Sequence, residues 1–229
     1  MSERGPAWAE SYPSLPYTIP FVVFFVFLLL HDYLTFLGPW EYVLRAVILA
    51  AVLWICSRHV VDLRVRLIVP SVLIGVVVFA IWIAPDLLFA GYRSHWLFQN
   101  SITGGSKISL PDGLRENTVV LIARAVRAVL IVPIIEELFW RAWLMRWLIN
   151  SDFRRLPLGT YSTYSMVVTA VLFASEHGPY WDVGLIAGFI YNWWIIRTKS
   201  LGDCILAHAV TNGALSAYVV MSGQWQYWM

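Results

Sequence analysis

Charged residues are scarce in this chain, and that scarcity excludes an ordinary soluble domain. Only 13% of its 229 residues are Asp, Glu, Lys or Arg, whereas 59% are hydrophobic, and the mean hydropathy is +0.68. A soluble globular domain usually has about a quarter charged residues. The composition therefore indicates a membrane protein, and the net charge of +2 identifies no class of partner.

Cysteine is also scarce. Cys56 and Cys204 are the two cysteines, and both fall inside apolar segments, which argues against a disulfide framework and favours packing as small apolar side chains. The sequence contains no visible internal repeat and no nucleic-acid motif, so nucleic acid is not an expected partner. No small-x-small cleavage site follows the first apolar run, and we expect that run to be an uncleaved span.

Long apolar runs are what the sequence does contain, and they predict an all-α polytopic transmembrane bundle of about seven spans, within a range of six to eight. A helix needs about 20 residues to cross roughly 30 Å of hydrocarbon. The expected spans are residues 18–37, 42–57, 67–88, a fourth ending near residue 149, then 164–177, 183–196 and 201–221. We expect residues 1–17 to be a cytoplasmic tail and residues 18–229 a single domain, with its motif-bearing core at 118–221.

Lys and Arg gather after the second, fourth and sixth expected spans, which places those loops in the cytoplasm. The three clusters are Arg58, Arg64 and Arg66, then Arg141, Arg146, Arg154 and Arg155, then Arg197 and Lys199. Seven spans then place the N-terminus in the cytoplasm and the C-terminus outside. We expect an integral protein of a bacterial inner membrane, with membrane lipid as a partner.

Two adjacent carboxylates, Glu136 and Glu137, lie inside the fourth apolar segment, where a charge indicates a functional site. Glu137 and Arg141 are four residues apart on one helix face, so the guanidinium can hold the carboxylate. Glu136 points about 100° away. The structural alternative is that both carboxylates form salt bridges with Arg141 and Arg146 near a helix end.

Two histidine motifs follow on later apolar segments. His177 ends the sequence Phe173-Ala-Ser-Glu-His177, and a histidine at the end of a helix is by itself most simply a cap or a packed residue. His208 and Asn212 are four residues apart and share one face, where hydrogen bonds between helices are the plainer role. Together, one glutamate and two histidines can activate water or ligate a metal.

In this order the motifs Glu-Glu-x-x-x-Arg, Phe-x-x-x-His and His-x-x-x-Asn resemble those of the CPBP intramembrane proteases. That group includes the CAAX prenyl endopeptidases and bacteriocin-processing or Abi-type proteins. The resemblance implies that Glu136 and His177 activate the attacking water and that His208 and Asn212 stabilise the oxyanion. Glu137 and Arg141 would support the site.

Many members of this group are described as metalloproteases, and the resemblance leaves a divalent metal such as zinc open as a cofactor. Its ligands would be Glu136, His177 and His208. The water-attack chemistry can be written without that metal.

The depth of the site depends on where the fourth span begins. A start at Thr118 would place Glu136 roughly 27 Å along the helix, close to the inner boundary. We therefore expect a start near Arg127, with Arg124 and Arg127 snorkelling to the outer interface. The alternative use of these two cations is to receive a carboxylate of the substrate.

The motifs together predict an intramembrane endopeptidase that cleaves a membrane-associated or lipidated protein in or beside the bilayer. The first alternative is a non-catalytic binding protein, such as an immunity factor or an export-assembly partner, that uses the same polar core. A small-solute transporter is a third interpretation, and the lack of repeat symmetry counts against it.

Overall fold

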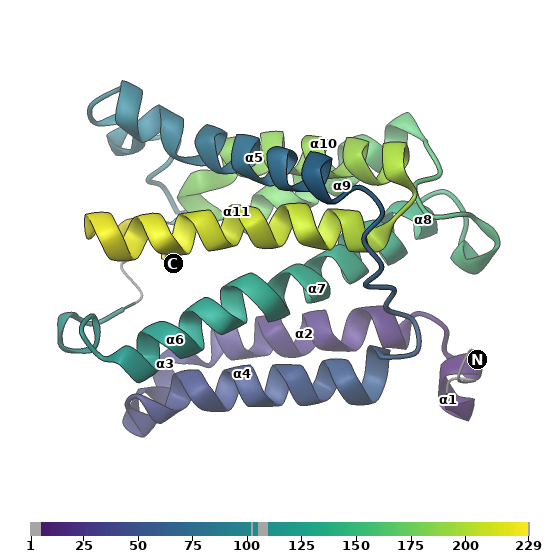
Figure 1. Cartoon of the computed structure of the whole chain (residues 1–229), viewed down its shortest axis with the longest axis horizontal. Helices are drawn as coiled ribbons and strands as arrows, with labels where there is room; N and C mark the ends of the chain where they lie inside the picture. The colour runs from purple at the N-terminus through teal and green to yellow at the C-terminus, as the bar shows by residue number, and fades with distance from the viewer. Residues whose placement is uncertain (1–5, 102, 105–109, 229) are drawn as a thin grey trace.

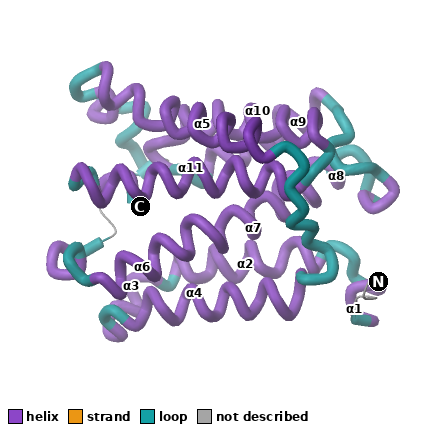
Figure 2. Tube along the Cα trace, viewed as in Figure 1, coloured by secondary structure: helices purple, strands orange, loops and turns teal. Residues whose placement is uncertain are grey.

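The computed structural model describes residues 6–101, 103–104 and 110–228, and within these ranges it contains helices, turns and loops but no β-strand (Figure 2). The all-α class predicted from the apolar runs is confirmed. Short elements connect the bundle helices: α1 (Ala7–Ser11), α3 (His31–Leu34) and the 3-10 turns Thr35–Leu37, Tyr92–Ser94, Asp112–Leu114, Phe153–Arg155, Gly178–Tyr180 and Trp225–Tyr227.

In the described part of the chain, seven longer helical segments form the bundle (Figure 1). They are α2 (Leu15–Leu29), α4 (Trp40–Val52, extended by Leu53–Ser57), α5 (Ile68–Leu88), the composite helix Thr118–Trp147, α9 (Thr163–Ser175), α10 (Trp181–Thr198) and α11 (Leu201–Ser222). Four of them are long and apolar enough to cross a membrane: Trp40–Ser57, Ile68–Leu88, Thr118–Trp147 and Leu201–Ser222. Two more, α2 and α9, are shorter apolar helices, so seven spans stays a prediction.

The chain runs back and forth along the bundle. The N-terminal helix α1, the connection between α4 and α5, and the region after α8 (Met145–Trp147) lie at one end of the molecule, and the last turn of α11 lies at the other (Figure 1). The loops that carry Arg58, Arg64, Arg66, Arg154 and Arg155 therefore share the end that holds α1. Which end faces the cytoplasm remains a prediction from the positive-inside rule.

The composite helix Thr118–Trp147 carries the first motif and crosses the bundle obliquely (Figure 1). It consists of α6 (Thr118–Val126), a π-helical turn at Arg127–Ile131, α7 (Val132–Glu137), a second π-helical stretch at Leu138–Leu144, and α8. Its 30 residues correspond to about 45 Å. This length exceeds the roughly 30 Å of hydrocarbon in a typical bilayer, so we expect a membrane-spanning helix of this kind to tilt.

The expected start of this helix near Arg127 is wrong, because the helix begins at Thr118. Asn117 caps it: its side-chain oxygen accepts hydrogen bonds from the backbone N–H groups of Val119 (3.1 Å) and Val120 (3.2 Å). An asparagine cap satisfies N–H groups that a helix end leaves free. Arg124 does not interrupt the helix, because its side chain is buried inside the bundle.

Helix α11 lies at the centre and packs closely on α5. A Cβ atom on Gly75 would lie 2.4 Å from the carbonyl oxygen of Ala207, so only glycine permits this approach of the two backbones. One turn further along α11, the Thr211 hydroxyl donates to the Gly75 carbonyl oxygen at 2.9 Å. These contacts fix the rotation of α11, and with it the direction in which His208 points.

Asp203 on α11 accepts hydrogen bonds from the backbone just before α5. Its Oδ1 accepts hydrogen bonds from the backbone N–H groups of Arg66 (2.7 Å) and Leu67 (3.0 Å), and the residue is fully buried. Asp203→Ala is expected to lower the free energy of unfolding by about 1–3 kcal/mol, because two backbone donors lose their acceptor. Thermal unfolding in detergent measures this loss. Asp62→Ala, at an exposed carboxylate, is the control, and an equal effect of the two changes would contradict this role of Asp203.

Candidate active site

A cavity of about 280 Å³ lies inside the bundle, and all four candidate catalytic residues line it. Glu136 comes from α7, His177 from the end of α9, and His208 and Asn212 from α11. Other parts of the wall come from α2, α5, α10 and the C-terminal turn. The fold thus brings three motifs that are far apart in sequence to one chamber.

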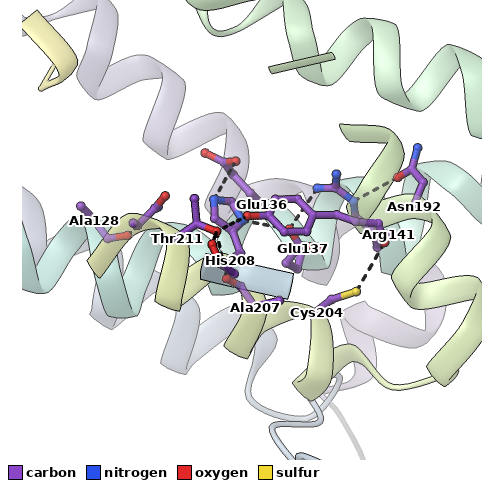
Figure 3. A network of polar contacts seen from close by, with 12 residues as sticks. Ala128, Glu136, Glu137, Arg141, Asn192, Cys204, Ala207, His208 and Thr211 are labelled. Atoms are coloured by element: carbon purple, nitrogen blue, oxygen red, sulfur yellow. Dashed lines mark hydrogen bonds and ion pairs between the residues drawn. The ribbon is translucent and has the colours of Figure 1, made fainter. Parts of the chain in front are cut away.

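Glu137 is the anchored member of the carboxylate pair. Its Oε1 accepts a hydrogen bond from the Arg141 guanidinium at 3.0 Å and lies 2.9 Å from Nδ1 of His208 (Figure 3). Both Glu137 and Arg141 are fully buried. Arg141 also donates through Nε to Oδ1 of Asn192 at 3.1 Å, and its guanidinium lies over the ring of Phe173, 4.5 Å from the ring centre.

Glu136 lies in a different environment from its neighbour. Its side chain lines the cavity, and among the described residues its Oε2 has no hydrogen-bond partner. The His208 ring lies nearby, with its Nε2 3.9 Å from that oxygen (Figure 3). A buried carboxylate without a hydrogen-bond donor is costly unless it has a function, and this one faces open volume.

His208 lies between the two carboxylates. The contact of Nδ1 with Glu137 directs Nε2 toward Glu136, and the imidazole stacks on the ring of Tyr191, with centres 5.1 Å apart and planes at 21°. The Tyr191 hydroxyl donates to Thr211 on α11 at 2.7 Å. A histidine held at one nitrogen and on one face presents its other nitrogen in a fixed direction.

His177 lines another part of the same cavity. Its Nδ1 lies 2.8 Å from the backbone oxygen of Phe173, so Nδ1–H donates there and Nε2 is left available. The ring lies against Trp82 and Phe173, with centres 5.1 Å and 4.7 Å away. Among the described residues no hydrogen bond joins His177 to Glu136. A water molecule between them would have to mediate any joint action.

Asn212 both lines the cavity and connects two helices. Its amide Nδ2 donates to the carbonyl oxygen of Ala128 at 2.9 Å, in the π-helical turn of the composite helix. Turns of this kind are frequent at functional sites. A carboxamide has two N–H donors, so the second can serve a ligand while the first holds α11 in place.

Sequence analysis missed Asn192 and Tyr191, which complete the network around Arg141 and His208. Besides accepting from Arg141, Asn192 donates to the backbone oxygen of Met166 at 2.9 Å and so connects α10 to α9. Asn192 is fully buried. A carboxamide inside an apolar span is the signal that could have identified it, whereas nothing local distinguishes Tyr191 from other aromatic residues.

The metal site considered for Glu136, His177 and His208 does not fit this geometry. Within the described residues, no three His, Cys, Asp or Glu side chains come close enough together to hold a metal ion. No step of the chemistry below is therefore assigned to a metal.

Arg124 and Arg127 also line the cavity. The expected snorkelling of Arg124 is wrong: its side chain is buried, and its guanidinium donates to the backbone oxygen of Trp228 at 3.0 Å. Trp228 itself is buried, with its indole N–H 3.3 Å from the hydroxyl of Ser216. The C-terminal turn therefore folds back over the chamber.

Comparison with known families gives a match over part of the chain. Residues 118–214 match the family described as Type II CAAX prenyl endopeptidase Rce1-like. This segment contains all four candidate catalytic residues, and the match confirms the resemblance predicted from the three motifs. Comparisons with curated proteins and with solved structures found no match.

Proposed function

With residues 118–214 matching a family of CAAX prenyl endopeptidases, we propose that this integral membrane protein is an endopeptidase that hydrolyses a membrane-associated or lipidated protein. The observation that carries the proposal is the environment of the Glu136 side chain. Its unpaired carboxylate faces a cavity that is also lined by His177, His208 and Asn212.

In the proposed reaction, Glu136 accepts a proton from a water molecule as the water oxygen attacks the scissile carbonyl carbon. His177 presents its free Nε2 to the same water and orients it. The proton taken by Glu136 then passes to the leaving amine as the C–N bond breaks. General-base assistance of this kind contributes about 10²–10⁴-fold to a rate.

His208 and Asn212 are proposed to face the developing oxyanion, His208 through Nε2 when that nitrogen carries a proton. A donor that is already oriented in a water-poor site contributes about 3 kcal/mol to the transition state. Glu137 and Arg141 are positioning residues in this proposal. They hold His208 through its Nδ1 and make no contact with the substrate.

The test compares the protein termini of membrane fractions from cells that carry the wild type or Glu136→Gln at equal abundance. Gln keeps the shape of Glu136 but cannot accept the proton, so termini that depend on the wild type should disappear. Glu10→Gln, at an exposed residue of α1, is the matched control and should retain them.

The opposite result would identify the competing function. If no terminus depends on Glu136 and the variant supports the wild-type phenotype, the polar network serves binding alone, as in an immunity or export-assembly protein. The interhelical hydrogen bond of Asn212 is the observation that keeps this second candidate open, since such bonds also stabilise membrane bundles without catalysis.

A further inference from the structure

The C-terminal turn (Trp225–Trp228) covers part of the chamber that holds the candidate site. Tyr227 and Trp228 both line the cavity, and both are buried. In this conformation the side chains beneath have little accessible surface, since Glu136 is 6% and His208 5% exposed. A partner larger than water can therefore meet these side chains only if part of the wall moves.

The helices of the wall are poorly suited to that movement. The backbones of α5 and α11 touch where Gly75 meets Ala207, and the hydrogen bond from Asn212 to the carbonyl oxygen of Ala128 ties α11 to the composite helix. Shifting any of these helices would also displace the candidate catalytic residues that they carry. The C-terminal turn carries none of them.

A glycine connects the turn to α11. Gly223 ends the helix with φ +69°, in the left-handed region, and its N–H donates to the carbonyl oxygen of Val219. The residue is exposed, so rotation there meets no packed neighbours. Positions that absorb large changes of φ and ψ in hinge motions are often small residues at the ends of elements, and Gly223 is such a position.

Side-chain hydrogen bonds hold the turn in place. The Tyr227 hydroxyl donates to Oδ2 of Asp86 on α5 at 2.9 Å. The Trp228 indole N–H donates to the hydroxyl of Ser216 at 3.3 Å, and the Trp228 carbonyl oxygen accepts from Arg124 at 3.0 Å. These bonds can break without any change in the backbone hydrogen bonds of the bundle helices.

Two of the groups that hold the turn keep another favourable contact when it leaves. Asp86 lies 3.3 Å from Nε of Arg93, so loss of the Tyr227 hydroxyl does not strand its charge. The guanidinium of Arg124 lies over the ring of Tyr42, 5.6 Å from the ring centre. Releasing the turn therefore avoids the large cost of an isolated buried charge.

We propose that the C-terminal turn is a gate: it pivots at Gly223, withdraws Tyr227 and Trp228 from the chamber, and so opens the polar site to its partner. The closed gate keeps water out of the chamber, and the open gate admits the partner. The inference goes beyond the proposed function and does not depend on it, because a binding protein with the same chamber would need the same opening.

The experiment measures how often the chamber opens, without using cleavage. Ala128 lines the cavity, and Ala128→Cys places a thiol there in the full-length protein in phosphatidylcholine nanodiscs. A maleimide that carries a sulfonate group labels the thiol, and mass spectrometry of peptides gives the rate. The native Cys204 is fully buried and serves as an internal control for general unfolding.

Tyr227→Phe keeps the ring in the chamber but removes the hydroxyl that Asp86 holds. Labelling at residue 128 should become about tenfold faster, because a hydrogen bond to a charged group contributes about that factor to an equilibrium and labelling follows the population of the open state. Tyr92→Phe is the matched control. It removes a hydroxyl that donates to Asp182 at 3.1 Å, away from the gate, and should leave the rate within twofold.

Gly223→Ala tests the hinge independently. A Cβ atom there would have free space, with its nearest neighbour, Nε1 of Trp225, 3.9 Å away. The left-handed backbone nevertheless disfavours any L side chain, so the closed turn becomes strained and labelling should rise roughly 5- to 30-fold. Labelling of Cys204 should stay unchanged in all of these variants.

Four results would overturn the gate. They are a rate at residue 128 that matches that of the unfolded protein before any gate substitution, an unchanged rate in Tyr227→Phe or in Gly223→Ala, an equal rise in Tyr92→Phe, and a parallel rise at Cys204. The first would show a chamber that is open without the gate, and the last would show loosening of the whole bundle.

Discussion

Glu136→Gln protein is expected to fold as the wild type does and to cleave its substrate about 10²–10⁴ times more slowly, the usual contribution of a general base. The substitution removes a proton acceptor that has no hydrogen bond at Oε2 among the described residues. It therefore breaks no hydrogen bond of that oxygen. Single-turnover rates on a substrate found from its new termini, together with thermal unfolding in detergent, measure both parts of the expectation.

Glu137, the neighbouring carboxylate, should respond differently to the same substitution. Glu137→Gln alters a side chain that contacts both Arg141 and His208, so it should lower stability as well as rate. If Glu137→Gln abolished cleavage without loss of stability while Glu136→Gln left the rate unchanged, the roles of the two residues would have to be exchanged.

Arg141→Leu is expected to lower the free energy of unfolding by about 3–5 kcal/mol, the cost of leaving one partner of a buried ion pair alone. Arg141 has no exposed surface. Its loss would leave Glu137 without its guanidinium partner and would remove the hydrogen bond accepted by Oδ1 of Asn192. Chemical unfolding in detergent measures the change.

A second substitution distinguishes a broken ion pair from a general packing defect. The double variant Arg141→Leu with Glu137→Leu removes both charges, so it should recover part of the loss, because paired apolar replacements of buried ions are often close to neutral. If the loss of stability in the double variant equalled the sum of the losses in the two single variants, the ion pair would contribute no coupling energy. The contact of Glu137 with His208 limits the recovery to a part.

The helices could be predicted from hydropathy, and their ends could be predicted only where a local signal exists. The expected span at residues 67–88 agrees with α5 (Ile68–Leu88), and that at 201–221 agrees with α11 (Leu201–Ser222). The composite helix was misplaced because Arg124 and Arg127 were treated as interfacial. The sequence alone does not distinguish an arginine that is buried in the bundle from one at the membrane interface, because tertiary packing decides between them.

In the candidate site, too, some contacts could be predicted from the sequence and others could not. The pairing of Glu137 with Arg141 follows from their spacing on one helix, and the structure contains it. The contact of Glu137 with His208 joins residues 71 positions apart and depends on how α11 packs across the composite helix. No spacing rule could give it. The roles of His177, His208 and Asn212 remain proposals for the same reason, since each depends on groups from other helices.

The short helix α9 bears on the supply of water. Its 13 residues reach about 20 Å, which is well below the roughly 30 Å of a typical hydrocarbon layer. A membrane accommodates such a helix by thinning next to it, and thinning brings the headgroups closer to the midplane on that side. His177 lies two residues beyond the end of this helix. If α9 spans the membrane as expected, the water of the proposed hydrolysis would have its shortest path from the aqueous phase along α9, through a thinned part of the bilayer rather than across the full thickness of the acyl chains.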